Sequence, residues 1–330
     1  MNRKTFTRAL LAPAWALLPL AAAQAQTPAS TFPAKPVRVV VPFPPGGGVD
    51  VITRMVGDKL TAVWGQPLVI DNKPGAGTLI AANTVATSPA DGYTVLAATA
   101  DTLAVAAALQ SKPIVLPEKT LQPLTQIVRT PLFIAVRPES PYQTLAQYVE
   151  DARRRPNALS YGSAGVGTIH HMAMETFSAQ ARIDVKHAAY RGSAPALADL
   201  LGGVLDVAVL DSPIALPQIK GGKIRVLAIS TAARSQIAPE VPTIAEQGYP
   251  GYAAMSWMGF AVARGTPPAV VDRLFTGIRD AIESPDVAQK LRAIGLEPVT
   301  SRSPADFESF AEGERTRWSA IIKAKNIQAD

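Results

Sequence analysis

Three glycine-rich segments contain the residues best suited to bind a small anion. They cover 43–47, 75–77 and 162–167, and each lies between a short apolar segment and a helical pattern. A junction of this kind places unpaired backbone N–H groups at the positive end of a helix, where carboxylates and phosphates bind. The sequence therefore predicts a site for an anionic ligand at these junctions.

The spacing of these glycines argues against a nucleotide as the ligand. The segments that begin at Gly75 and Gly165 match G-x-G-x-x, but both lack the third glycine of the dinucleotide-binding pattern. Segment 222–224 contains Gly and Lys but lacks the Ser or Thr of a phosphate-binding loop. The formal net charge of +6 falls to +3 without the three cations of the first eight residues, and no basic stripe with interleaved aromatic residues is present. A nucleic-acid partner is therefore not predicted.

Ser163 is a candidate nucleophile, because segment 162–165 resembles the nucleophile elbow of hydrolases. The elbow has the pattern G-x-S-x-G, and here one residue is missing before the serine. We therefore predict no catalytic residue and no enzyme activity. A periplasmic hydrolase built on Ser163 stays an alternative, which loss of ester turnover in Ser163→Ala would support.

His170, His171 and His187 do not predict a metal site. Adjacent histidines point to different faces of a helix, and only His171 and Glu175 have i,i+4 spacing. The chain has no cysteine, which excludes disulfides, thiol catalysis and iron–sulfur or Cys–zinc sites. We interpret the histidines as structural hydrogen-bonding residues and Trp257 as core or hinge packing, and we predict neither a metal nor a cofactor.

Strands and helices must position these loops, and their order is that of a parallel α/β protein. A β-branched segment at 37–41 leads into the first loop, after which apolar residues recur at helical spacing until 63. The same order returns at 68–85 and at 159–179. Because 330 residues exceed what one hydrophobic core usually serves, we expect two lobes.

The N-terminal segment 1–25 has the features of a secretory signal peptide. A basic region at 1–8 precedes an apolar stretch at 9–23, and Ala23 and Ala25 form an A-x-A cleavage pattern. The apolar stretch is shorter than a spanning helix needs. We therefore predict an exported, periplasmic protein whose mature chain begins at Gln26.

Motifs along the whole mature chain resemble those of the Bug family, the extracytoplasmic solute-binding proteins of tripartite tricarboxylate transporters. The motifs are FPAKPVR at 32–38, VPFPPGG at 41–47, DNKPGAG at 71–77, DGYT at 91–94, YGSAG at 161–165 and VPTIAE at 241–246. The resemblance implies a type II periplasmic-binding-protein fold, with two doubly wound α/β domains joined by two crossover segments. Prolines and glycines near 129–131 and 239–251 mark the expected crossings, so lobe 1 would comprise 36–128 and 251–330, and lobe 2 would comprise 129–250.

The resemblance also implies which residues bind the ligand. Carried over position by position, they are Phe43, Pro45, Gly46, Gly47, Asp50, Gly75, Ala76, Gly77, Ser163, Ala164, Gly167, Thr168, Tyr190 and Asp211. Two positions depart from the family pattern: Thr78 stands where a further glycine is common, and 209–211 stands where an aromatic residue followed by Asp and Asn is frequent. Asp211 could accept a hydrogen bond from an amine or a hydroxyl, or repel a second carboxylate.

The function that follows from the resemblance is solute capture. A small carboxylated solute, either an organic acid or an amino acid, would bind between the lobes of a monomer and pass to inner-membrane permease subunits. A receptor that reports to a membrane sensor is the alternative, since nothing in the chain separates the two partners.

Overall fold

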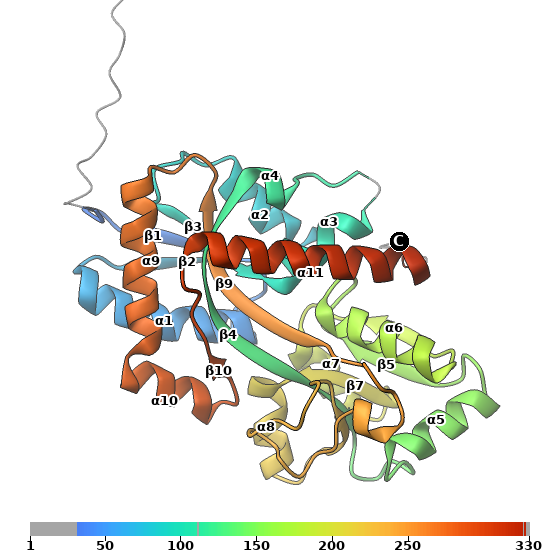
Figure 1. The fold of residues 1–330 in the computed structure, drawn as a ribbon. Helices are drawn as coiled ribbons and strands as arrows, with labels where there is room; N and C mark the ends of the chain where they lie inside the picture. Colours follow the sequence, from blue (N-terminus) through green and yellow to red (C-terminus); the bar gives the residue numbers. More distant parts are fainter. Residues whose placement is uncertain (1–31, 111, 326, 328–330) are drawn as a thin grey trace, which may run out of the picture.

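The computed structural model describes residues 32–110, 112–325 and 327 (Figure 1). The predicted signal peptide at 1–25 lies outside these residues. Within the described ranges, no helix combines the length and the apolar character that a membrane crossing requires.

The elements form two halves that meet at the long strand β4 (Leu121–Val136) (Figure 1). The first half contains β1 (Val37–Val41), α1 (Gly48–Trp64), β2 (Leu68–Asn72), η2 (Ala76–Thr78), α2 (Leu79–Ala86), β3 (Thr94–Thr99), η3 (Asp101–Val105), α3 (Ala106–Leu109), α4 (Pro117–Thr120), β9 (Met255–Ala263), α9 (Pro268–Glu283), α10 (Pro285–Ala293), β10 (Glu297–Pro298) and α11 (Pro304–Lys325). The second half contains α5 (Leu145–Arg154), β5 (Ser160–Ser163), α6 (Ile169–Ala181), β6 (Lys186–Ala189), α7 (Ser193–Leu201), β7 (Val207–Asp211), α8 (Ser212–Lys220), β8 (Arg225–Ile229) and η4 (Ala245–Gln247).

The strands form one curled sheet in the order β2-β1-β3-β9-β4-β7-β5-β6, and β8 and β10 also pair with β4. β1 is parallel to both of its neighbours, and so is β5. In such sheets ligands bind outside the carboxyl end of the strand from which connections diverge to both sides. The loops after β1 and β5, which the sequence singled out, lie at these two points.

β4 connects the two halves without a break. Its residues 121–131 pair with β9, and residues 132–136 pair with β7 and β8. Pro123 and Pro131 lie in the part that pairs with β9, and a proline cannot donate a hydrogen bond to a ladder. Shifts of register beside Pro123 accommodate the first proline. The predicted limits of the lobes stay a prediction, and the first of them falls within this strand.

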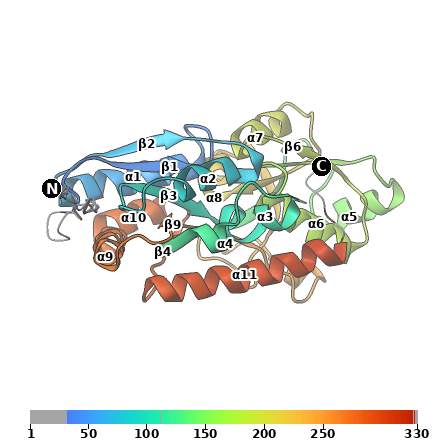
Figure 2. The ribbon, with the colours of Figure 1, turned by 90° about the horizontal axis from the view of Figure 1, so that it is seen from above.

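α11 lies across both halves, as both ribbon views show (Figures 1 and 2). Its Trp318 is fully buried in an apolar core that also includes Leu96 of β3 and Phe177 of α6. One core therefore continues from the first half into the second. The α/β class with two doubly wound halves agrees with the sequence prediction.

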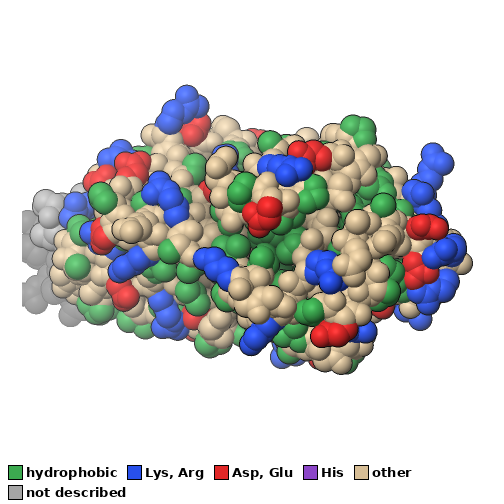
Figure 3. Space-filling view, turned by 90° about the horizontal axis from the view of Figure 1, so that it is seen from below, with side chains coloured by type: hydrophobic (Ala, Val, Ile, Leu, Met, Phe, Trp, Pro, Cys, Tyr) green, Lys and Arg blue, Asp and Glu red, His purple; other side chains and the backbone are tan. Residues whose placement is uncertain are grey.

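The molecular surface mixes charges of both signs. On the face drawn in Figure 3, Lys and Arg side chains are interspersed with Asp and Glu side chains, and hydrophobic side chains gather near the middle. This face carries no basic stripe of the kind that binds nucleic acid.

Candidate functional site

A cavity of about 210 Å³ is lined by residues of both halves. Segment 43–49, Thr99 and Asp101 come from the first half, and segment 191–195, His170 and Asp211 come from the second. Most of these residues follow the carboxyl ends of strands β1, β3, β6 and β7. The cavity thus lies where a doubly wound sheet is expected to bind a ligand.

Asp50 fixes the shape of the loop after β1. Its carboxylate accepts hydrogen bonds from the backbone N–H of Gly46 at 3.0 Å, from Arg54 Nε at 2.9 Å and from Asn72 Nδ2 at 3.0 Å. Burial acts to raise the pKa of Asp50, but the bonds from Arg54, Gly46 and Asn72 together lower it below the ordinary value. Asp50 therefore holds the loop from behind and does not line the cavity.

Three helices begin at the cavity without a side-chain cap. They are α1, α7 and α8, whose N-cap residues Gly47, Gly192 and Asp211 make no capping hydrogen bond. The first N–H groups of a helix have no partner within it, and the helix dipole makes this end positive. An anion in the cavity can therefore accept hydrogen bonds from helices of both halves.

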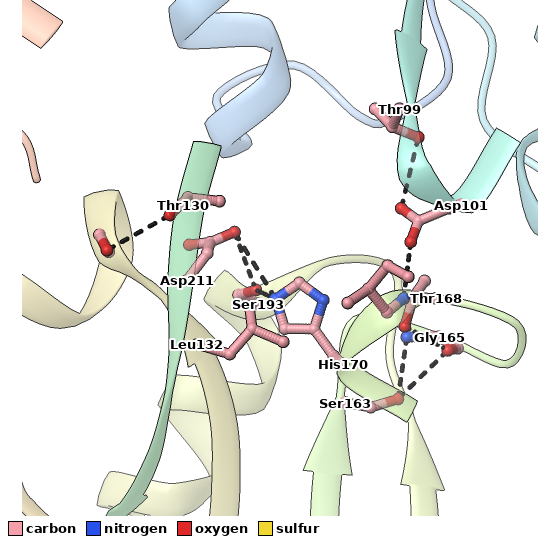
Figure 4. Close-up of polar contacts among 12 residues, drawn as sticks. Thr99, Asp101, Thr130, Leu132, Ser163, Gly165, Thr168, His170, Ser193 and Asp211 are labelled. Carbon is pink, nitrogen blue, oxygen red and sulfur yellow. Dashed lines mark hydrogen bonds and ion pairs between the residues drawn. The ribbon is translucent and has the colours of Figure 1, made fainter. Parts of the chain in front are cut away.

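The N-terminus of α6 is occupied instead by side chains of the protein. Thr168 caps the helix by accepting from the N–H of His171 at 3.4 Å, and Asp101 accepts from the N–H of Ile169 at 2.6 Å (Figure 4). Burial raises the pKa of Asp101 to about 6, the bonds from Ile169 and Thr99 act against it, and nearby Asp211 adds to the rise. Asp101 belongs to the first half and α6 to the second, so this contact joins the two.

A polar cluster lies at one end of the cavity lining. Ser193 Oγ lies 3.2 Å from His170 Nε2 and donates to Asp211 Oδ2 at 3.3 Å (Figure 4). Burial lowers the pKa of His170, which is only 6% exposed, so its ring is neutral at pH 7. Within the part of the chain that the structure describes, no partner is found for His170 Nδ1 or Asp211 Oδ1.

The residues that the sequence singled out fall into two groups. Those that line the cavity are Phe43, Pro45, Gly46, Gly47, Ala164 and Asp211, and those that do not are Asp50, Gly75, Ala76, Gly77, Ser163, Gly167, Thr168 and Tyr190. Several of the second group hold loops in place: Ala76 accepts from Gln110 Nε2 at 3.2 Å, and Tyr190 Oη donates to Asp199 at 2.6 Å.

Ser163 is completely buried behind the loop after β5. Its Oγ lies 2.6 Å from His187 Nε2 and accepts from the N–H of Gly165 at 3.1 Å. Burial, with a smaller contribution from nearby His171, lowers the pKa of His187 to about 4, and the two imidazole rings stack at 4.1 Å. A substrate in the cavity would not reach this serine, which gives the hydrolase alternative no geometric support.

Several cavity residues had no signal in the sequence motifs. Asp101, His170 and Ser193 supply polar atoms, and Trp257 and Met258 of β9 supply apolar surface. Trp257 packs edge-on against Phe307 and Phe310, as core packing predicts, and it also lines the cavity. Asp101 lies two residues after the end of β3, and this position at the carboxyl end of a parallel strand is the one signal that could have identified it. Across the described residues, no group of three or more His, Asp or Glu side chains is arranged to hold a metal ion.

Comparisons with known proteins agree with the fold. The model of the tripartite tricarboxylate transporter family receptor matches residues 52–327. Protein BugT of Bordetella pertussis is 33% identical over 299 residues, which cover 89% of this chain and 90% of BugT.

Two solved structures have the same fold. Rpa4515 of R. palustris with adipate is 35% identical, with a TM-score of 0.86, over 90% of this chain and 99% of that one. MatC (Rpa3494) from Rhodopseudomonas palustris with bound malate is 28% identical, with a TM-score of 0.83, over 88% of this chain and all of that one. These matches confirm the type II periplasmic-binding-protein fold and the resemblance to the Bug proteins. The chain belongs to the family of tripartite tricarboxylate transporter receptors.

Proposed function

We propose that this protein is a periplasmic receptor that binds one small carboxylated solute in the cavity and delivers it to permease subunits of the inner membrane. The convergence of three uncapped helix N-termini, from both halves, on one cavity carries the proposal. Two relatives of the same fold have adipate and malate as ligands, which supports a carboxylate here.

The solute's carboxylate would accept hydrogen bonds from the backbone N–H groups at the start of α1 and α7. Gly48 and Val49 belong to the first helix, Ser193 and Ala194 to the second, and all four line the cavity. Arg191 adds a positive charge, and Phe43 and Trp257 enclose the apolar part of the solute. Asp50, the 75–77 loop and Ser163 would then act by holding these groups in place.

Capture would work by closure of two lobes, comprising 36–128 with 251–330 and 129–250. A ligand that contacts both lobes favours the closed form by its differential affinity, without a covalent step or an enzyme's chemistry. A micromolar site needs about 8 kcal/mol, which four to six hydrogen bonds to a charged ligand at about 1.5–3 kcal/mol each can supply after the cost of closure.

A screen of mono-, di- and tricarboxylates and amino acids by thermal shift, followed by calorimetry, tests the binding function. A ligand at 100 times its dissociation constant adds roughly 2.7 kcal/mol to stability. Arg191→Met should weaken binding about tenfold. Arg292→Met, which removes an exposed charge from α10, should not. If no carboxylate binds, or if the two variants behave alike, the proposal is wrong.

Delivery to a permease needs a separate measurement. Uptake of the radiolabelled solute should fall to background in cells that lack this gene and return on complementation. Unchanged uptake together with a lost transcriptional response would instead identify a receptor for a sensor.

A further inference from the structure

Asp211 is the N-cap residue of α8, but its side chain does not cap this helix. An Asp at this position ordinarily accepts a hydrogen bond from the N–H of the second or third helical residue. The second residue of α8 is Pro213, which has no N–H, so the available donor is the N–H of Ile214. Because no such bond is formed, the Asp211 carboxylate lies elsewhere.

The Asp211 carboxylate lies where two other helices begin. Its Oδ2 accepts a hydrogen bond at 3.3 Å from Oγ of Ser193, the first residue of α7 (Figure 4). A Cβ on Gly48, the first residue of α1, would lie 3.4 Å from the same oxygen. A carboxylate of the second half thus lies at the positive ends of α1 and α7. A solute carboxylate at these ends would meet a negative charge of the protein.

Asp211 is held more weakly than Asp101, which also lines the cavity. Asp101 accepts from the N–H of Ile169 at 2.6 Å. Asp211 Oδ2 accepts only from Ser193 among the described residues, and Oδ1 is buried without a partner there. His170 Nε2 lies 3.8 Å from Oδ2, but the ring is neutral and balances no charge. Asp211 is therefore the acid that a solute can displace.

We propose, on the basis of the function proposed above, that the solute's carboxylate replaces the Asp211 carboxylate at the starts of α1 and α7. Asp211 then turns to the N–H of Ile214 and caps its own helix. The hydroxyl of Ser193, released from Asp211, donates to the solute. Asp211 sets the affinity of the receptor in this way, because each carboxylate that binds must first displace it.

Calorimetry with two series of carboxylates, acetate to hexanoate and malonate to adipate, tests the competition. Asp211→Ser removes the protein's carboxylate, and serine is itself a good N-cap residue for α8. The best carboxylate should bind this variant about tenfold more tightly than wild type, which corresponds to one hydrogen bond between charged and neutral groups. Asp211→Glu, which keeps the charge, should show no such gain. Asp272→Ser, which removes an exposed acid from α9, should leave the affinity unchanged.

The outcomes separate this inference from the receptor function. Unchanged or weaker binding in an Asp211→Ser protein that melts normally would overturn the inference, while binding to wild type would still support the receptor. Binding to Asp211→Ser alone would support both. If neither protein binds any carboxylate of the two series, the receptor function fails and the inference fails with it.

A crystal structure of the complex between the wild-type protein and its best carboxylate tests the displacement itself, and it does not require the variant to fold. We expect the Asp211 carboxylate within hydrogen-bond distance of Ile214 N, and the solute's carboxylate within that distance of Ser193 Oγ. A complex in which Asp211 still accepts from Ser193 would overturn the inference, whatever the affinities of the variants.

Discussion

The loops after β1 and β5 share a sequence pattern but differ in what their helix N-termini bind. Both loops are glycine-rich, follow a parallel strand and precede a helix. After β1, the start of α1 has no side-chain cap and faces the cavity. After β5, Thr168 and Asp101 already bind the N–H groups at the start of α6. The glycines provide donors in both places, and side chains from elsewhere decide whether these donors are available to a solute. We call the loop after β1 the open loop and the loop after β5 the filled loop.

The largest effect is expected at the open loop, where Gly48→Val places a branched side chain at the cavity. A Cβ on Gly48 would lie 3.4 Å from Asp211 Oδ2, so the methyl groups of Val would keep the two halves apart. A ligand that loses two hydrogen bonds from one half binds at least about 100-fold more weakly. Calorimetry should show this loss with little change in the melting temperature of the free protein. Gly313→Val on α11, which has open space beside its Cα, is the control; equal affinities in both variants would contradict an open α1 site.

A smaller effect is expected when the support of the open loop is removed in Asp50→Ala. The change leaves the Gly46 N–H, Arg54 and Asn72 without their shared acceptor. The variant should lose about 2–4 kcal/mol of unfolding free energy, and the ligand affinity should fall because the loop is no longer held. Urea denaturation and calorimetry measure the two effects. Asp58→Ala, an exposed acid on the same helix, should change neither; a stable Asp50→Ala protein would show that the loop keeps its shape unaided.

The two loops also show how far the sequence predicts this molecule. The loop after β1 is held by Asp50, seven residues after Phe43, so a local motif was enough to locate it. Asp101 and Ile169 are 68 residues apart, and only the folded chain brings them together. The first part of β4 has no local strand signal for a related reason, since its partner β9 lies far along the chain and Pro123 argues against a strand.

Asp101, which binds the start of α6 after the filled loop, should make the unfolding free energy depend on pH. The Asp101→Asn variant removes this titrating group and so isolates its contribution. The pKa of Asp101 is about 6 in the folded protein against an ordinary value of 3.8, mainly because of burial. The folded state therefore binds a proton that the unfolded state has released between about pH 4 and pH 6, and this contribution to stability is lost as pH rises through that window. Relative to wild type, the variant should gain roughly 2–3 kcal/mol between pH 4 and pH 7.

Urea unfolding of both proteins across this pH range measures the difference. His171 and His187, whose pKa values burial lowers to about 4, act in the opposite direction and destabilise the fold as pH falls. Their effect is common to both proteins and cancels in the difference. A difference that does not change with pH would mean that Asp101 is not held as a buried acid at α6.

The smallest effect on binding is expected behind the filled loop. Ser163→Ala, alone or with Thr168→Ala, removes hydroxyl groups that bond to Gly165, His187 and the start of α6. Because Ser163 is completely buried and outside the cavity, we expect about 1 kcal/mol less stability for each lost hydrogen bond and less than a twofold change in affinity. Ala164→Val is the matched test, since the neighbouring residue lines the cavity and its enlargement should weaken binding. Calorimetry and urea unfolding of both variants distinguish a residue that only supports the loop from one that contacts the solute. A tenfold loss of affinity in Ser163→Ala at unchanged stability would place the loop after β5 in contact with the solute, and the two loops would then be alike.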